Sequence, residues 1–541
     1  MSISSLEKKL FPKEGSREYL VLRSLQSSLI TKWCSALKDP KTSQQKRLQL
    51  ILQNTKGTVV GQDYDLHPSM SFDQFRQHVP VTNYDSYHKT YLQRVHKGQK
   101  KIISATPITS CMESSGTTGK PKWIPINNMW EQSVLQAQKL WITSMVKDFP
   151  QASRGRSLSI VSKTFHGHTE GGISIGSNTG RMLARQPWYI KRNPILPKDV
   201  QNIENQQALQ YTILRFALQN SISVWTTANP STILLYCRRL LEWKQELTRD
   251  LWDGTLRQGP ASVLPDEQRT ILERTLVPTP PPRIWKPAYI WPLGVVNCWK
   301  GGPAQYFASQ LTRNLGAEIP IREVGVSASE GHFSVPMSQY DEGGTLWTMG
   351  HVVEFVDDSN VSHWAWEVEK GKQYRIVITT EAGLLRYDLQ DLVEIVGFTE
   401  CTPQIRFVGK VGNFLNAVGE KVSEEQISYV LQQIAEEGII GCTVRIHWSE
   451  VPHYILAVEG VVDPLKFCRL FDQYLKEQNI EYKSKRESSR LGMPTFQQLP
   501  DGFYVQYRQK CVEQGASDAQ VKDIIVCSEE KWNTICTQDF M

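Results

Sequence analysis

Residues 206–247 are the stretch that most restricts how this chain can fold, because helical and strand patterns alternate there. Leu209, Ile213 and Phe216 recur at helical spacing and predict a helix over 206–220. Residues 222–225 alternate as a strand, and an apolar helical stripe over 233–247 follows the cap at 229–231. A helix, a strand and a helix in this order predict an open α/β sheet. Because 541 residues exceed what one core usually supports, we expect at least two domains.

A polar loop precedes this region. Residues 113–122 hold two glycines, four hydroxyl side chains and two lysines, including the run Ser114, Ser115, Gly116, Thr117, Thr118 and Gly119. Free backbone amides, hydroxyls and Lys122 suit a polyphosphate, although the spacing is not that of a Walker A loop. A flexible surface loop is the alternative. Pro121, Pro125 and the apolar pair Trp123–Ile124 stiffen the exit and favour a nucleotide site.

Composition excludes several classes of protein. A formal charge of +6 with 21% charged and 40% apolar residues is ordinary for a globular protein and does not indicate nucleic-acid binding. The basic residues between Lys483 and Arg490 are expected to be solvated, Arg486 included. The ten cysteines occur singly, so neither a disulfide framework nor a zinc site is expected. Residues 1–15 lack a signal peptide's apolar core and residues 288–299 are too short to span a membrane, so we expect a cytoplasmic protein with no membrane partner.

Three further segments carry candidate functional groups. His166, His168 and Glu170 share a glycine-rich loop, but no additional ligand at metal-site spacing supports a metal there. The apolar stretch 324–328 leads to Ser329 and Glu330, which we expect at the carboxyl end of a strand, where α/β sheets bind ligands. Glu330 there suits the magnesium of ATP, and a glutamate at a helix start is the alternative.

The third segment, 384–393, contains Tyr387 and Asp391, and either Asp391 or Asp388 could instead be a turn residue. Gly409 and Gly412 beyond it are able to absorb the backbone rotation of a hinge. Lys421 stands just before a capping box formed by Ser423 and Gln426. A solvated lysine is the alternative for Lys421.

The order of these motifs resembles the adenylate-forming enzymes. The Glu-Ser-Ser opening at Glu113 is similar to the GH3 acyl acid amido synthetases, and the resemblance extends over residues 44–527. Residues 326–330 resemble the family's Tyr-Gly-Ser-Ser-Glu, with Val326 and Ser327 in place of Tyr and Gly. Residues 387–391 resemble its Tyr-Arg-x-Gly-Asp, with Asp388 and Gln390 in place of Arg and Gly.

The resemblance implies an α/β protein with a large ATP- and acyl-acid-binding domain over 1–408 and a smaller, mobile α/β cap over 409–541. It implies ATP and Mg²⁺ as cofactors, with Glu330 as the metal ligand and Lys122 and Lys421 beside it as catalytic groups. Ser329, Tyr387 and Asp391 would contact the nucleotide, Asp391 through the ribose hydroxyls. His166, Thr169 and Gly172 would lie near the acyl acid.

The activity implied is formation of an acyl adenylate from a carboxylic acid, followed by transfer of the acyl group to an amine, which we expect to be an amino acid. Two alternatives from other classes stay open. One is an acyl-CoA ligase that passes the acyl group to a thiol. The other is a non-catalytic nucleotide or acyl-acid binder, which the altered second and third motifs bring into consideration.

Overall fold

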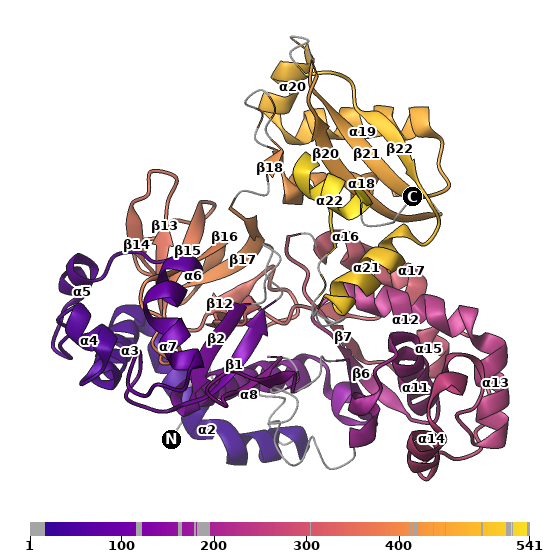
Figure 1. The fold of residues 1–541 in the computed structure, drawn as a ribbon, viewed down its shortest axis with the longest axis horizontal. Coiled ribbons are helices and arrows are strands. Elements are labelled where there is room, and N and C mark those ends of the chain that lie inside the picture. Colours follow the sequence, from indigo (N-terminus) through magenta and orange to yellow (C-terminus); the bar gives the residue numbers. More distant parts are fainter. Residues whose placement is uncertain are drawn as a thin grey trace.

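A computed structural model describes residues 17–537 except 115–121, 161–164, 178–179, 181–194, 303, 412–413, 416, 418–419, 421, 436–437, 450, 488–490, 515–520 and 522. Figure 1 shows two parts. Residues up to the strand β17 form a broad body, and the residues after it form a lobe that stands above that body. The chain is a mixed α/β protein, as the alternating pattern predicts.

The first sheet of the body is parallel and has the order β3-β6-β7-β8. Its strands are β3 (Arg156–Ser159), β6 (Ile222–Thr226), β7 (Val295–Asn297) and β8 (Ile321–Arg322). The helix–strand–helix prediction is confirmed by α11 (Gln206–Leu218), β6 and α12 (Pro230–Glu242). The predicted cap is also present, because the side chain of Asn229 accepts from the amide of Ser231 at 3.0 Å. Trp225 and Trp291 meet edge to face at the centre of its core, with ring centroids 5.6 Å apart.

Further helices surround this parallel sheet, lying mostly at the right of Figure 1. They are η3 (Lys198–Asn202), α13 (Lys244–Asp253), η4 (Gly259–Val263), α14 (Asp266–Glu273), α15 (Pro287–Ile290), α16 (Ala304–Ser309) and α17 (Leu311–Leu315), with η2 (Pro150–Ser153) before β3.

The second sheet has seven strands, all antiparallel to their neighbours, in the order β11-β12-β17-β16-β15-β13-β14. They are β11 (Ser334–Val335), β12 (Gly344–Leu346), β13 (Val352–Val356), β14 (Ser362–Trp364), β15 (Gln373–Thr379), β16 (Tyr387–Thr399) and β17 (Thr402–Lys410). The sequence did not predict this sheet, because β12 pairs with β17 across a long stretch of chain and such pairing leaves no local signal.

Amino-terminal helices share one core with this antiparallel sheet. Pro40 opens α3 (Pro40–Thr55) after α2 (Arg17–Lys38), and Asp39 caps α3 through the amide of Thr42 at 2.9 Å. A proline lacks the amide hydrogen that a continuing helix requires, so Pro40 separates the two helices. The following elements are α4 (Val59–Asp63), α5 (Phe72–His78), α6 (Tyr84–Tyr87), the π-helical turn η1 (His88–Leu92) and α7 (Gln93–His96).

The third sheet lies between these two regions and has the order β2-β1-β5-β4. Its strands are β1 (Ile108–Ser114), β2 (Lys122–Asn127), β4 (Gly167–His168) and β5 (Ser174–Gly176). After β2, Asn127 caps the long helix α8 (Asn128–Asp148) by accepting from the amide of Trp130 at 3.0 Å. Helix α8 contributes to a buried cluster with α2 in which Trp33 and Trp347 lie 5.0 Å apart. It therefore ties the third sheet to its neighbours.

Ser329 and Glu330 follow the carboxyl end of a strand, as expected, but this strand does not belong to the open parallel sheet. Ser329 and Glu330 do not end a parallel strand; they form the turn between β9 (Ser327–Ala328) and β10 (Gly331–His332), a short antiparallel hairpin. The parallel strand of this region, β8, ends earlier at Arg322. Buried Glu323 stops the strand there, since its carboxylate accepts hydrogen bonds from the backbone amides of Val324 and Gly325.

The upper lobe has a core of its own, built from residues between Leu415 and Ile525. Its three-stranded sheet, β20-β21-β22, consists of β20 (Ile439–His447), β21 (His453–Gly460) and β22 (Thr495–Leu499). Its other elements are β18 (Phe414–Leu415), β19 (Val422–Ser423), α18 (Glu424–Gln433), α19 (Pro464–Gln478), α20 (Ile480–Glu487), α21 (Phe503–Glu513) and α22 (Glu529–Thr537). The capping box of Ser423 and Gln426 at the start of α18 is confirmed.

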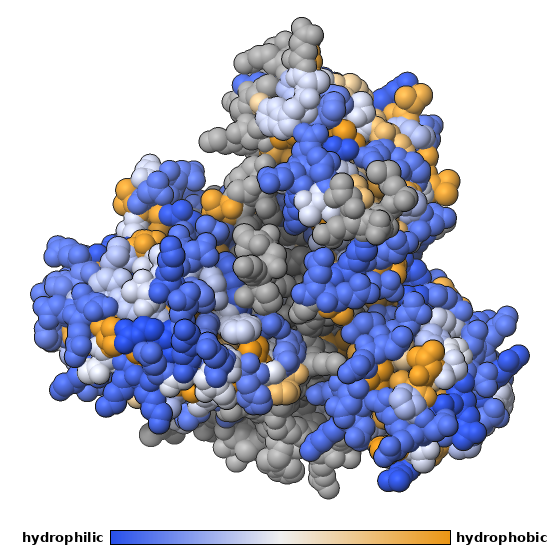
Figure 2. All heavy atoms as spheres, viewed as in Figure 1, coloured by the Kyte–Doolittle hydropathy of each residue, from blue (hydrophilic) through white to orange (hydrophobic). Residues whose placement is uncertain are grey.

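The face drawn in Figure 2 is mostly hydrophilic. Among the helices of the described residues, none combines the length and the hydropathy that crossing a membrane requires. The expectation of a solvated basic stretch holds for Lys483, whose side chain is 53% exposed, but is wrong for Arg486, which is 12% exposed and paired with Asp472 at 2.6 Å. Arg490 lies outside the described residues.

Candidate active site

The hydroxyl-rich loop connects β1 to β2, two antiparallel neighbours. The last pair of that ladder is Ser114 opposite Lys122, so the two ends of the loop are held side by side. Ser115, Gly116, Thr117, Thr118 and Gly119 lie outside the described residues, and of Ser114 only the backbone is described. The strands therefore fix where a phosphate-binding loop would begin and end.

Glu330, the candidate metal ligand, is buried in the turn between β9 and β10. The indole N–H of Trp130 donates to its backbone carbonyl at 2.7 Å, and the phenol of Tyr387 hydrogen-bonds to its side chain. Burial, and then the charge of Glu330, raises the pKa of Tyr387, so that this phenol stays protonated and acts as the donor. The second and third motifs thus meet at Glu330.

A magnesium ion that accompanies ATP takes one or two carboxylates, water and phosphate oxygens as ligands. A single buried carboxylate such as Glu330 fits that requirement. In the described part of the chain, no three His, Cys, Asp or Glu side chains gather as a metal site, so no metal held by protein groups alone is indicated there.

Ser329 and Tyr84 contact the two ends of the loop. The hydroxyl of Ser329 donates to the carbonyl of Glu113 at 3.4 Å. The ammonium of Lys122 lies 5.2 Å from the ring centroid of Tyr84, whose hydroxyl accepts from the amide of Trp123 at 3.1 Å. Burial raises the pKa of Tyr84, to which the nearby charge of Glu330 adds. Tyr84 is therefore part of this site, although no motif in the sequence marks it.

The third motif lies on β16, which is attached to the segment before α6. The amide of Thr82 donates to the carbonyl of Arg386, and the carbonyl of Thr82 accepts from the amide of Asp388, each at 2.8 Å. Tyr387 thereby lies next to the segment that leads into α6, the helix that begins at Tyr84.

Asp391 occupies a bulge of the same strand. Val377 of β15 pairs with Asp388 of β16, and Arg375 of β15 pairs with Leu392 of β16. Between these two pairs β15 has one residue, whereas β16 has the three residues from Leu389 to Asp391. Within the bulge Gln390 has φ +57°, the left-handed conformation that glycine adopts at no cost and that explains a glycine at this position of the family motif. Asp391 is 7% exposed and stands opposite Lys410, the last residue of β17 before the lobe.

His166 contacts the loop through Glu113. Its Nδ1 hydrogen-bonds to Oε2 of Glu113, whose Oε1 accepts from the indole of Trp123 at 3.3 Å. Burial alone would raise the pKa of Glu113, but the hydrogen bonds from His166 and Trp123 outweigh it and hold that pKa below its usual value. No spacing in the sequence predicts this pair, because the two residues are 53 positions apart.

Thr169 and Gly172, also expected near the acyl acid, shape the same loop as His166. The Thr169 hydroxyl accepts from the amide of Ile173 at 3.1 Å, and the Thr169 carbonyl accepts from the amide of Gly172 at 2.9 Å. Gly172 has φ +80°, as a tight turn requires. These contacts turn the chain from β4 into β5.

Lys421 lies outside the described residues, as do Gly412 and Asn413 of the expected hinge. Its neighbour Glu420 is buried and accepts from the hydroxyl of Tyr454 at 2.8 Å and from the amide of Ala417 at 2.7 Å. The structure therefore fixes the residue before Lys421 within the lobe.

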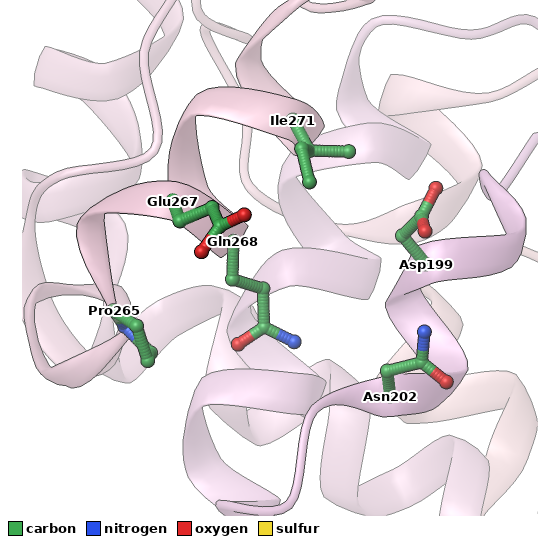
Figure 3. Close-up of a pocket in the computed structure, with 6 residues that line it drawn as sticks. All are labelled: Asp199, Asn202, Pro265, Glu267, Gln268 and Ile271. Carbon is green, nitrogen blue, oxygen red and sulfur yellow. The ribbon is translucent and has the colours of Figure 1, made fainter.

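The pocket in Figure 3 lies elsewhere, between η3 and α14. It is lined by Asp199, Asn202, Pro265, Glu267, Gln268 and Ile271. None of these residues belongs to the motifs, and the hydrogen-bonded set around Glu113 and Glu330 is the better candidate site.

Curated relatives align with most of this chain. The jasmonoyl-L-amino acid synthetase JAR6 of Nicotiana attenuata is 22% identical over 92% of this chain and 93% of its own length. The indole-3-acetic acid-amido synthetase GH3.4 of Arabidopsis thaliana is 24% identical, covering 90% of this chain and 89% of its own length.

Among solved structures, a GH3.15 acyl acid amido synthetase superimposes with a TM-score of 0.80 at 19% identity, covering 98% of this chain and 97% of that chain. A 2-hydroxyisobutyryl-CoA ligase in complex with 2-HIB-AMP has a TM-score of 0.53 at 13% identity, covering 93% and 92% of the two chains. These superpositions establish a shared fold.

Three domain families match consecutive parts of the sequence. They are the GH3 family N-terminal domain over residues 30–321, the GH3 family central domain over 344–410 and the GH3 family C-terminal domain over 425–531. Since these segments account for most of the chain, and the motif residues Glu330 and Tyr387 meet in the structure, this chain belongs to the GH3 family.

Proposed function

We propose that this chain is an ATP-dependent acyl acid amido synthetase. It joins a carboxylic acid to AMP and then transfers the acyl group to the amine of an amino acid. The observation that carries the proposal is the connected set of Glu113, Ser329, Glu330 and Tyr387 beside the ends of the β1–β2 loop. The amido synthetase names of relatives aligned over about nine-tenths of the chain support it.

The first step brings a carboxylate towards the α-phosphate of ATP, and two anions repel each other. Pre-placed positive charge and donors offset such repulsion. In the proposal the amides and hydroxyls of residues 114–119 hold the phosphates, and Lys122 and Lys421 add positive charge. Asp391 accepts hydrogen bonds from the ribose hydroxyls.

Glu330 would hold Mg²⁺, with Tyr387 fixing the orientation of its carboxylate by a hydrogen bond. The ion, when bound with ATP, supplies charge neutralisation on the phosphates. Ser329, anchored on the carbonyl of Glu113, keeps the hairpin turn against the end of β1.

We also propose that the chain divides between residues 408 and 409 into a large domain and a smaller cap, and that the cap moves between the two steps. The separate core of residues 415–525 and the end of β17 at Lys410 support this boundary. Movement of the cap would carry Lys421 to and from the phosphates.

The decisive experiment supplies the purified protein with ATP, Mg²⁺ and a panel of carboxylic acids, with hydroxylamine as a general acceptor, and measures pyrophosphate release. With an accepted acid, a mixture of amino acids should then accelerate AMP release while CoA should not. Mass spectrometry of the product identifies the amide.

An acyl thioester formed with CoA, with no amide under the same conditions, would instead assign the chain as an acyl-CoA ligase. Absence of pyrophosphate release with every acid, together with measurable ATP binding, would assign it as a non-catalytic nucleotide binder.

A further inference from the structure

Glu113 and His166 form a carboxylate–imidazole pair at the edge of the candidate site. Their side chains are 16% and 17% exposed, so the pair is largely shielded and still reaches solvent. Glu113 immediately precedes the hydroxyl-rich loop, and its carbonyl accepts from Ser329, the neighbour of Glu330. The pair therefore adjoins both segments between which the acid and ATP would react.

The hydrogen bonds of Glu113 orient the imidazole. The two oxygens of Glu113 accept from His166 Nδ1 and from the indole of Trp123, which keeps the carboxylate ionised and assigns the imidazole hydrogen to Nδ1. Nε2 then carries the lone pair, and no residue of the described ranges hydrogen-bonds to it. An imidazole oriented by a carboxylate through one ring nitrogen, with the other nitrogen open to the substrate, is the arrangement of a general base.

The charge of the pair indicates which substrate it serves. The pair presents the carboxylate of Glu113 at this edge of the site, and a carboxylate repels a second carboxylate and attracts an ammonium group. An amino acid reaches the enzyme as an ammonium and must lose a proton before its nitrogen can attack. This requirement is specific to the second step of the proposed function, since the acid in the first step is already an anion.

We propose that His166 is the general base that deprotonates the incoming amine, with Glu113 as the residue that orients it. The inference rests on the proposed amido synthetase function. As the C–N bond forms, the C–O bond between the acyl carbon and the phosphate of AMP breaks, and AMP leaves with that electron pair. An ammonium loses two protons on becoming an amide nitrogen. The proton lost before the attack goes to Nε2 of His166, and Glu113 stabilises the resulting imidazolium. The proton lost as the C–O bond breaks is taken up by the phosphate of the departing AMP.

The test compares two acceptors that differ in the need for a base. Hydroxylamine is already uncharged at neutral pH, whereas an amino acid is protonated there. His166→Asn keeps a donor towards Glu113 and removes the base. Its rate with the amino acid should fall by about 10²- to 10⁴-fold, the usual contribution of general acid–base catalysis, while its rate with hydroxylamine should fall by less than about tenfold.

Two further variants sharpen the comparison. Glu113→Gln keeps the hydrogen bond and removes the charge, so it should lower the amino-acid rate more than the hydroxylamine rate. His168→Gln is the matched control, because His168 is exposed in the same loop and packs edge to face on Phe165, with ring centroids 5.0 Å apart. It should leave both rates unchanged.

Equal losses with both acceptors, or an equal loss of acid-dependent pyrophosphate release, would overturn the inference and make His166 a residue that binds the acid. Unchanged rates in His166→Asn would also overturn it. If His166→Asn does not fold, the ratio of the two rates in Glu113→Gln decides. A wild-type protein that accepts no amino acid contradicts the proposed function itself, which this comparison distinguishes from failure of the base.

Discussion

At the scale of single residues, Glu330 is the side chain on which the candidate chemistry depends most. Glu330→Gln keeps the shape and still accepts the hydrogen bond of Tyr387, but it deletes the charge that would bind Mg²⁺. We expect acid-dependent ATP–pyrophosphate exchange to fall by about 10- to 100-fold, because interactions with a charged group contribute about 1.5–3 kcal/mol. Exchange near the wild-type rate at limiting Mg²⁺ would exclude Glu330 as a ligand.

Asp391 gives a second prediction at this scale. It occupies the bulge of β16 and is almost fully buried at the end of the strand that faces the lobe. If it holds the ribose, Asp391→Ala should weaken ATP binding by about 1.5–3 kcal/mol, measured by calorimetry. Asp388→Ala, in the same strand, is the comparison variant and should change ATP affinity less. Equal ATP affinity in wild type and Asp391→Ala would leave Asp391 with a structural role only.

Gln390 lies in that bulge with φ +57°, a conformation that costs a residue with a side chain about 1–2 kcal/mol. Gln390→Gly should remove this cost, but glycine also makes the unfolded chain more flexible, which offsets part of the gain. We expect a net stabilisation of about 0.5–1 kcal/mol, measured as a higher midpoint of urea unfolding. Gln373→Gly, at an exposed position of β15 without a left-handed backbone, should destabilise instead. A lower midpoint for Gln390→Gly would contradict the strain.

At the scale of secondary-structure elements, Asp472 fastens α20 to α19. Its carboxylate accepts from Lys476 and from Arg486 Nε, each at 2.6 Å, and from the hydroxyl of Tyr482 at 2.8 Å. Burial would raise the pKa of Asp472, but these partners outweigh it and lower that pKa. Asp472→Asn breaks a buried ion pair and should cost the lobe about 3 kcal/mol at neutral pH.

The pH dependence of this effect follows from the sign of the shift. Because the folded pKa of Asp472 lies below the unfolded value, the stabilisation is present above the unfolded pKa and is lost as pH falls through the folded pKa. The difference between wild type and Asp472→Asn should therefore shrink in acid. Lys483→Ala, which breaks an exposed 4.0 Å pair on the same helix, should change stability by less than about 1 kcal/mol at any pH.

At the scale of the whole molecule, one set of polar contacts between the lobe and the body lies at the start of α12, in addition to the ion pair of Arg406 with Glu425 and the packing of Phe307 against the lobe's core. Arg508 of α21 donates to Ser231 at 3.3 Å and to Thr232 at 3.0 Å, and Asn229 donates to the carbonyl of Val521 at 3.1 Å. Ser231, Thr232 and Asn229 all lie at the start of α12. In Figure 1 this helix of the body lies next to α21 of the lobe. A cap that moves between the two half-reactions would break this set of contacts.

Arg508→Ala should weaken this docked arrangement, since each lost hydrogen bond contributes about 0.5–1.5 kcal/mol. We expect small-angle X-ray scattering to give a larger radius of gyration for the variant in the absence of substrates. Arg257→Ala, which removes an exposed pair with Glu273 within the body, is the control and should leave the scattering curve unchanged. Identical curves for Arg508→Ala and the wild type would mean that these contacts do not hold the lobe.

The sequence by itself determined the features that depend on neighbouring residues. The apolar period over 206–220 predicted the helix α11, and the hydroxyl and amide side chains at Ser423 and Asn229 predicted two helix starts. Helical periodicity and capping act within a few positions of the chain, so they can be read locally. The order of the three motifs likewise identified the family.

Only the tertiary structure decided which of these segments meet. It made Ser329 and Glu330 the turn of a hairpin, put Tyr387 against Glu330 and paired Glu113 with His166. It also gave Gln390 a left-handed backbone and buried Arg486 against Asp472. Strand pairing and side-chain contacts between residues far apart in the chain depend on the packing of the complete core, and this packing leaves no periodic signal in the sequence around any one of them.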